Sequence, residues 1–208
     1  MVTRFTFCIY YNIIMVAGSI LPVALHKGKL HFLFGKENPM EDSAKGFSDF
    51  GGGVNAGETP FNAALREGSE ELTGFFGNKE ELEELITKNG GIAHTLTEKS
   101  YTVHMFLIDY DANLPRYYNL NHRFLWDNMD TDYLNKSKLF EKIEIQWFTP
   151  EMMKQRRGEF RNFYQEIVDL ILKDVPNILK LVGAKTKKHK SDSSGDVGRR
   201  KSSKRKKR

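Results

Sequence analysis

The chain has 208 residues, a length that suits one domain with an appendage, and its charge is unevenly distributed. Residues 185–208 hold 12 Lys or Arg and 2 Asp, so residues 1–184 carry 20 basic and 25 acidic side chains, and the net charge of +5 comes from the C-terminal segment. The one cysteine, Cys8, excludes a disulfide within the chain and a zinc site made of cysteines, and it indicates a reducing compartment.

The N-terminal residues are apolar but do not form a clean hydrophobic segment. Residues 5–16 follow a lone Arg4, as in a secretion signal. Tyr10 and Asn12 interrupt this run, and no stretch reaches the roughly 20 clean apolar residues of a membrane span. We therefore predict an apolar extension or a leading strand over residues 1–16, no membrane partner, and an intracellular protein.

The next segment is predicted to open with a β-hairpin. Short apolar runs at residues 19–25 and 29–34 flank a turn at residues 26–28. Residues 37–45 are polar and predict a surface loop. The three glycines at positions 51–53 follow, and we predict no regular element there, because glycine weakens both helices and strands.

Two helices are predicted in the middle of the chain. Thr59 can cap the first, Pro60 suits its first turn because the missing N–H would have no partner there, and Gly74 can end it. Residues 79–88, which are rich in Glu and Leu, predict a second helix before the run Asn-Gly-Gly. The two helices together place an acidic segment between the hairpin and the later strands.

The second half of the chain alternates strand-like and helical patterns. Residues 101–110 are prone to β structure throughout, and residues 143–148 predict another strand. Residues 111–140 are long and irregular, and segments of this length within a domain are usually functional or partly structured. A closing amphipathic helix is indicated by apolar residues at helical spacing: Phe160, Phe163, Tyr164, Ile167, Leu170 and Ile171.

The order of elements favours an α/β fold with a mixed β-sheet between helices. We assign the folded domain to residues 17–184 and a disordered basic tail to residues 185–208, which have almost no apolar side chain. The basic end of the tail resembles a nuclear import signal, could equally bind RNA through phosphate contacts, or could be a solubilising extension only. The location is accordingly predicted as cytoplasmic or nuclear.

The first helix carries a cluster of carboxylates. At about 100° per residue, Glu67, Glu70 and Glu71 fall on one arc of about 100°, with Arg66 as the counter-charge immediately beside them. Three such carboxylates repel one another by a few tenths of a kcal/mol per pair, so a cation among them is indicated. Oxygen ligands in a compact group suit Mg²⁺ or Mn²⁺, which can polarise a phosphoryl group and activate water. The glycines at 51–53 and the helix N-terminus favour a phosphate anion nearby.

This segment resembles the signature of the Nudix hydrolase family, G-x5-E-x7-R-E-U-x-E-E-x-G-U, where U is a bulky aliphatic residue. Six fixed identities stand at the family spacings: Gly52, Glu58, Arg66, Glu67, Glu70 and Glu71. The resemblance implies an α/β/α sandwich and a Mg²⁺- or Mn²⁺-dependent pyrophosphohydrolase. Such an enzyme cleaves a diphosphate linkage by water attack on phosphorus, in a nucleoside diphosphate linked to another group.

The sequence departs from the family signature at two positions. Gly68 stands where an aliphatic residue is expected, within the apolar stripe of the helix, which predicts close packing against a neighbouring strand at a helix cost of about 1 kcal/mol. The final glycine, Gly74, comes one residue late, which puts the helix end in doubt. Neither departure removes a group that the resemblance implicates in the chemistry.

The resemblance also implies roles for the site residues. The metal ligands would be Gly51 through its carbonyl, Glu67, Glu70 and Glu71. Arg66 would orient the glutamates through a salt bridge, and Glu58 would support the site. Many family members add a later carboxylate shortly before a strand that ends in Trp; Glu141, six residues before Trp147, is the candidate, with Glu144 in reserve. Either Glu67 or Glu141 would activate the water.

The substrate itself is less constrained by the sequence. The glycines Gly52 and Gly53 would let a phosphate approach the backbone, and Tyr117, Tyr118 and Trp126 could stack on a nucleobase or simply anchor their loop. The basic tail favours an RNA-linked substrate such as a 5′ cap over free nucleotides or nucleotide sugars. The alternative is a module of the same fold that binds a nucleotide or RNA without hydrolysing it, with the tail as a tether.

Overall fold

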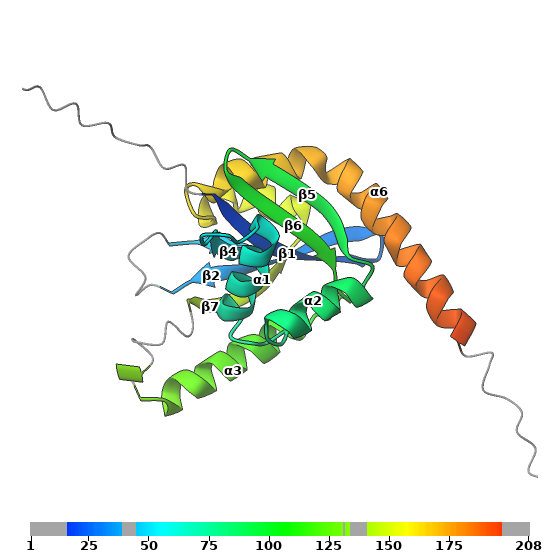
Figure 1. The fold of residues 1–208 in the computed structure, drawn as a ribbon. Coiled ribbons are helices and arrows are strands. Elements are labelled where there is room, and N and C mark those ends of the chain that lie inside the picture. Colours follow the sequence, from blue (N-terminus) through cyan, green and yellow to red (C-terminus); the bar gives the residue numbers. More distant parts are fainter. Residues whose placement is uncertain (1–15, 39–44, 131, 134–140, 197–208) are drawn as a thin grey trace, which may run out of the picture.

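The structure, a computed structural model, describes residues 16–38, 45–130, 132–133 and 141–196, with side chains up to Thr186. The strands are β1 Ala17–His26, β2 Lys29–Glu37, β3 Phe47–Ser48, β4 Phe50–Gly53, β5 Ile92–Glu98, β6 Tyr101–Leu107 and β7 Lys142–Phe148. The helices are α1 Pro60–Glu71, α2 Lys79–Lys88, α3 Leu114–Asn128, α5 Pro150–Gln155, the 3-10 turn η1 Arg157–Glu159, and α6 Tyr164–Asp196. Figure 1 shows how these elements are arranged.

The strands form one mixed sheet. Its main path has the order β3-β2-β1-β6-β5, while β4 pairs with β1 and β7 pairs with β2. The central strands β1 and β6 are parallel, and the other pairs are antiparallel. The predicted hairpin is confirmed, with Lys27 and Gly28 in the left-handed conformation that its tight turn requires. The strand β5 was not predicted, because its alternation of apolar and polar residues is short and follows directly on two glycines.

Helices cover both faces of the sheet. Successive residues of a strand point to opposite faces, so Leu21 and Val23 of β1 belong to one core, and Ile20 and Ala24 to the other. The first core is closed by α5 and α6, and the second by α1, α2 and α3. The predicted α/β/α sandwich with a mixed sheet is therefore confirmed. Within the described ranges, no helix is both long and apolar enough to cross a membrane.

The helix α3 occupies half of the segment 111–140, which the sequence predicts as long and irregular. Pro115 stands in its first turn, where the missing N–H costs no hydrogen bond. Tyr118 and His122, one turn apart, are its buried residues. The helix itself was not predicted, because its buried stripe is narrow and the Asn and aromatic residues around it resemble the composition of a loop.

The glycines at positions 51–53 lie in a regular strand, which corrects the prediction that no element forms there. In β4, Gly51 pairs with Ser19 and Gly52 pairs with Gly18. A Cβ atom on Gly51 would lie 2.3 Å from the carbonyl oxygen of Gly18. The glycine at position 51 is therefore required by the close approach of β4 to β1, whereas a Cβ at position 52 would meet the carboxyl group of Glu67 and one at position 53 would meet no atom within 4 Å.

The C-terminal helix extends beyond the predicted domain boundary. The sequence predicts a disordered tail from residue 185, whereas α6 continues to Asp196 and passes the edge of the sheet (Figure 1). Residues 184–194 contain neither Gly nor Pro, so nothing in them stops the helix. Residues 197–208 of the predicted tail and residues 1–15 of the predicted extension lie outside the described residues.

Asp49 is a buried acid that joins three strands of the sheet. It lies between β3 and β4, and its two carboxylate oxygens accept hydrogen bonds of 2.5 Å from the hydroxyls of Ser19 on β1 and Tyr101 on β6. Burial raises the pKa of Asp49 to about 6, although both hydroxyl bonds act to lower it. In an unfolded chain the pKa of an aspartate is about 3.9, so the folded state binds this proton more tightly.

We expect Asp49 to make the protein more stable in mild acid than at neutral pH. Because its pKa is raised on folding, its contribution to stability is full below about pH 4 and is lost as the pH rises through about 6, a change on the order of 3 kcal/mol. Asp49→Asn should flatten the dependence of the unfolding free energy on pH between these values, measured by urea unfolding in EDTA. Asp127→Asn, on the exposed face of α3, is the control. An unchanged pH profile in Asp49→Asn would contradict the raised pKa.

Candidate functional site

The helix α1 is anchored at its start and packed closely along its length. The side chain of Thr59 accepts a hydrogen bond of 3.1 Å from the backbone N–H of Asn62, and Pro60 occupies the first turn, as predicted. A Cβ atom on Gly68 would lie 2.5 Å from Cδ1 of Ile20 on β1. The close packing expected at Gly68 is confirmed, and it fixes how far α1 stands from the sheet.

Glu67 lies directly on the backbone of the glycine strand β4. A Cβ atom on Gly52 would lie 2.5 Å from the carboxyl carbon of Glu67, and 2.7 Å and 2.8 Å from its two oxygens. Only a glycine at position 52 therefore leaves room for this carboxylate. The side chain of Glu67 is partly exposed, so its oxygens face both the strand and the solvent.

Arg66 connects four groups around Glu67. Its Nε and Nη2 atoms donate to the two oxygens of Glu58 at 3.1 Å and 3.0 Å, and Nη1 donates to Glu67 at 2.5 Å. Nη2 also donates to the carbonyl oxygen of Gly53 at 3.0 Å, and Nη1 lies 3.8 Å from a carboxylate oxygen of Glu70. These bonds raise the pKa of Arg66, and they lower the pKa of Glu58. The guanidinium thus fixes Glu67 relative to both the loop and the strand.

The three clustered glutamates differ sharply in exposure. The side chain of Glu70 is 63% exposed, that of Glu67 is 21% exposed, and that of Glu71 is 6% exposed. This order follows their positions around α1, since Glu71 lies nearest the apolar stripe and Glu70 lies farthest from it. Of the three, Glu67 and Glu70 are therefore the carboxylates that a ligand in solvent can reach.

Glu71 is held inside the protein and does not face solvent beside the other two. One oxygen accepts a hydrogen bond of 2.8 Å from the backbone N–H of Gly51, and the other lies 3.2 Å from Nζ of Lys142. Burial raises the pKa of Glu71, while Lys142 and the Gly51 N–H act in the opposite direction. The structure therefore separates Glu71 by burial from Glu67 and Glu70, with which it shares one arc of α1, and its role as a metal ligand stays a prediction.

Lys142 and Glu37 are site residues that sequence reasoning missed. The ammonium group of Lys142, 1% exposed, contacts Glu37 and donates to Oγ of Ser48 at 2.9 Å. Glu37 also accepts from Nη1 of Arg161 at 2.6 Å. No local signal marks these residues, because each sits at the end of a strand that a polar residue commonly closes. Their pairing depends on contacts between residues more than 90 positions apart.

Glu67 and Glu70 suit a hard cation that fills the rest of its coordination shell with water and substrate phosphates. Among the described residues, no group of three or more His, Cys, Asp or Glu side chains is arranged to hold a metal ion. Glu67 and Glu70 offer carboxylate oxygens beside β4, which carries no side chain at positions 51–53. Two carboxylates, carbonyls and waters fit Mg²⁺ or Mn²⁺, which are commonly held by one or two carboxylates and substrate phosphates.

The two later carboxylates lie at the start of β7. The backbone carbonyl of Glu141 accepts from the N–H of Asn38 at 2.8 Å, and a carboxylate oxygen of Glu144 lies 3.8 Å from Nζ of Lys36. Residues 134–140, which precede Glu141, lie outside the described residues. The role of Glu141 as a further acid therefore stays a prediction.

A cleft of about 340 Å³ lies between α3 and the start of β7. Its lining residues are Asn38, Asn119, His122, Arg123, Trp126, Ile143 and Glu144. The indole of Trp126 stacks on the imidazole of His122, with the ring centres 5.9 Å apart. The cleft lies beside β7, and Lys142 of the same strand contacts Glu71 of α1.

The three aromatic residues predicted to contact substrate are separated by the structure. Trp126 lines the cleft, whereas Tyr117 is 52% exposed and is not among the lining residues. Tyr118 is buried, and its hydroxyl donates to the backbone carbonyl of Lys142 at 2.9 Å and more weakly to that of Glu71 at 3.3 Å. These bonds fit the alternative that Tyr118 anchors its segment, and its stacking on a base stays a prediction.

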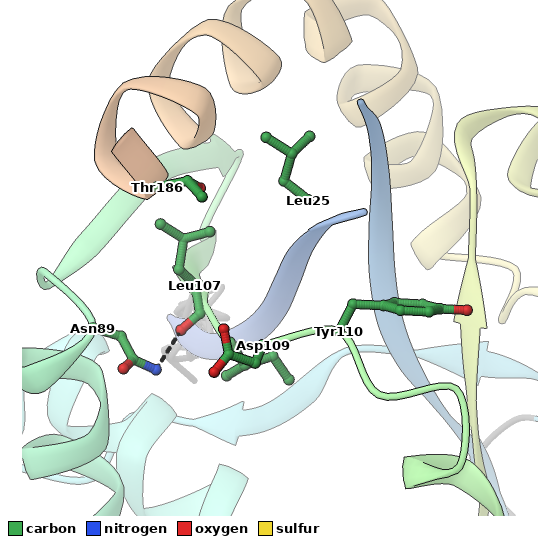
Figure 2. A pocket seen from close by; sticks show the side chains of 7 residues that line it. Leu25, Asn89, Leu107, Asp109, Tyr110 and Thr186 are labelled. Carbon is green, nitrogen blue, oxygen red and sulfur yellow. Dashed lines mark hydrogen bonds between the residues drawn. The ribbon is translucent and has the colours of Figure 1, made fainter. Parts of the chain in front are cut away.

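A second, smaller cavity of about 110 Å³ lies at the other end of the sheet (Figure 2). It opens beside Leu25 and Leu107, at the carboxyl ends of the parallel strands β1 and β6, and Nδ2 of Asn89 donates to the carbonyl of Leu107 at 2.8 Å. The glycine strand pairs with the amino end of β1, from Ala17 onwards. This cavity is therefore separate from the glutamates of α1.

Comparison with known proteins gives no matching family model and no matching curated protein. Among solved structures, the chain is similar to an Ap4A hydrolase of C. elegans, with 18% identity, a TM-score of 0.46, and coverage of 79% of this chain and 98% of that one. It is similar to a mutT/nudix family protein of Listeria innocua, with 12% identity, a TM-score of 0.42, and coverage of 80% and 97%. It is also similar to a NUDIX family hydrolase of Clostridium perfringens, with 14% identity, a TM-score of 0.38, and coverage of 77% of this chain and 97% of that one. At these values, we take the function from this chain's own side chains.

Proposed function

We propose that this protein is a Nudix hydrolase that cleaves a diphosphate linkage in a nucleoside diphosphate joined to another group. The observation that carries the proposal is the carboxylate of Glu67 lying on the bare backbone of Gly52, held by Arg66 beside Glu70. The family spacing makes these residues candidates, and the fold brings them to one place. Phosphate chemistry needs an oxygen-rich cation site next to accessible backbone, which is what this arrangement offers.

Each residue of the site has a part in the proposed reaction. Bound Mg²⁺ or Mn²⁺ would polarise a phosphoryl oxygen and favour attack by water on phosphorus. Glu67 and Glu70, with a carbonyl of the glycine strand such as that of Gly51, would hold the ion. Arg66 keeps Glu67 in position, and Glu58 keeps Arg66 in position.

The proposed reaction is a hydrolysis that breaks the bond between phosphorus and the bridging oxygen. Water forms the new bond to phosphorus, its proton passes to a carboxylate, and the second phosphate leaves with the bridging oxygen. Glu141 and Glu67 both remain candidates for the proton acceptor. The guanidinium of Arg66 donates to the Glu67 carboxylate at 2.5 Å, and a carboxylate held in this way suits the part of a ligand better than that of a base.

The cleft beside α3 is proposed to bind the nucleobase. The indole of Trp126 offers a stacking face, and Arg123 at the same cleft can approach a phosphate. Gly52 and Gly53 leave the backbone of β4 open to the diphosphate. The cleft would bind a planar group of the substrate, and the site at α1 would bind its diphosphate.

The more specific substrate that we propose is a nucleoside diphosphate linked to RNA. The 12 basic residues of the segment 185–208 would attract a polyanion, and capped RNA is a diphosphate-linked nucleoside with such a chain attached. A module that binds a nucleotide without hydrolysing it is the competing function. Every glutamate and the arginine of the family signature are present, which favours the enzyme.

The experiment that tests the proposal is product release by the purified full chain with Mg²⁺ or Mn²⁺. The panel holds capped RNA, a dinucleoside polyphosphate, ADP-ribose, a nucleotide sugar, nucleoside triphosphates and an inositol pyrophosphate. We expect cleavage of at least one member that stops when EDTA removes the metal. If a folded protein cleaves none of them but binds one, the binding module replaces the enzyme.

A further inference from the structure

The outward face of α3 carries three large apolar side chains in contact with solvent. Tyr117, Leu120 and Phe124 are 52%, 49% and 65% exposed. Their helical spacing puts them in one row, on the side of α3 opposite to its buried stripe. Single exposed apolar residues are ordinary on a protein surface, whereas a contiguous group of them marks an interaction site. The row therefore indicates a surface that binds another molecule.

An arginine precedes each of the two aromatic residues in this row. The pairs Arg116-Tyr117 and Arg123-Phe124 stand seven residues apart, almost two full turns of the helix, so both pairs lie on the same side of α3. They are separated by about 10.5 Å along the helix, the length of roughly three nucleotides in a stacked strand. Both arginines are exposed, and neither forms an ion pair within the described part of the chain. Each pair thus offers a positive charge and an aromatic ring to a ligand.

The charges beside the row favour a polyanion over a second copy of the chain. The two arginines border the row on one side, and Asn121 and Asn128 border it on the other. A second α3 laid on this face would bring one acidic residue, Asp127, for the two arginines. A single-stranded nucleic acid brings a phosphate and a flat base with every nucleotide, so it can supply both arginines and both rings at once.

The row leads to the cleft that is proposed to bind the nucleobase. Arg123 belongs to both, because it lines the cleft together with Trp126, three residues further along α3. A chain attached to a nucleotide in the cleft would leave it beside Arg123 and Phe124. It could then follow α3 back towards Arg116 and Tyr117, near the start of the helix. The face of α3 is therefore continuous with the place where the substrate's nucleoside is expected.

We propose that the outward face of α3 binds the single-stranded RNA chain of the substrate. Tyr117 and Phe124 stack on bases, Arg116 and Arg123 contact phosphates, and Leu120 offers an apolar contact between the two rings. The inference rests on the proposed function, because it follows the chain attached to the nucleotide in the cleft. It gives this chain a position on the folded domain that is separate from the basic segment 185–208.

The test measures the affinity of the full chain for a labelled, uncapped single-stranded RNA of about 12 nucleotides, by fluorescence anisotropy in EDTA. The double variant Tyr117→Leu with Phe124→Leu keeps apolar side chains and helix propensity but removes both stacking faces. It should weaken RNA binding about tenfold or more. Phe163→Leu, the matched control, makes the same change at an exposed ring that precedes α6 and should leave the affinity unchanged.

A second variant, Arg116→Gln, tests the phosphate contacts through their salt dependence. Loss of one phosphate contact should reduce the slope of the logarithm of the binding constant against the logarithm of salt concentration by about 0.7. Lys88→Gln removes a positive charge from the exposed face of α2 and should keep the slope of the unaltered chain. All variants retain the basic segment 185–208, so its own attraction for RNA cancels in the comparison.

Unchanged RNA affinity in the double leucine variant overturns the inference. A dimer of the unaltered chain that Leu120→Glu dissociates in light scattering, with no loss of RNA affinity, assigns the face to a second copy and also overturns it. Anisotropy in EDTA needs no cleavage, so the substrate panel answers separately for the proposed function. Cleavage of small nucleotides without the expected RNA effect keeps the enzyme and removes this surface. The RNA effect without cleavage of any substrate keeps this surface and replaces the enzyme with the binding module.

Discussion

Glu67→Gln is expected to lower kcat by about 10²–10³-fold on whichever substrate the panel identifies. Glutamine has the shape of glutamate and can still accept the bond from Arg66, so the packing against Gly52 is retained. The variant loses the negative charge that a divalent cation needs at this position. Steady-state kinetics with saturating Mg²⁺ would show the loss mainly in kcat and kcat/KM together, as for an interaction that stabilises the transition state.

The matched control for this variant is Glu83→Gln, which makes the same chemical change on the exposed face of α2. It should keep the rate of the unaltered chain, and both variants should keep its circular dichroism spectrum. A kcat in Glu67→Gln within about threefold of the control would show that the Glu67 carboxylate does not hold a cation that the reaction needs.

Gly18→Ala is expected to destabilise the protein by roughly 3 kcal/mol or more. A Cβ atom at this position would lie 1.8 Å from the carbonyl oxygen of Pro60 and 2.6 Å from its carbonyl carbon. These are backbone atoms at the start of α1, so no side chain can turn aside to make room. Either α1 moves away from β1 or the strand bends, and both changes separate the glutamates from the glycine strand.

Urea unfolding measures this effect, with Gly158→Ala as the control. A Cβ atom on Gly158 meets no atom within 4 Å, and its φ is not in the left-handed region, so the same substitution should be tolerated there. Gly18→Ala should also lower activity at temperatures where it is still folded, because the start of α1 is displaced. A stability within about 0.5 kcal/mol of the control would mean that α1 does not press on β1 as the structure has it.

The start and the acidic face of α1 could be predicted from the sequence because both are local. Thr59 and Pro60 act within the first turn of the helix itself, Thr59 as its cap and Pro60 in its first turn. The 3.6-residue repeat alone places Glu67 and Glu70 on one face. The turn at Lys27 and Gly28 is equally local. Such features depend on residues within a few positions of one another, so tertiary packing had little to add.

The tertiary structure alone decided which of the three glutamates is buried. Glu71 and Lys142 stand 71 positions apart, and their ion pair exists because β7 and α1 pack on the same sheet. The same holds for Gly51 of β4, which pairs with Ser19 of β1 and has no room for a Cβ atom beside it. Local propensity determined where α1 begins and which of its faces is charged. Packing against distant elements then buried Glu71 and left Glu67 and Glu70 in contact with solvent.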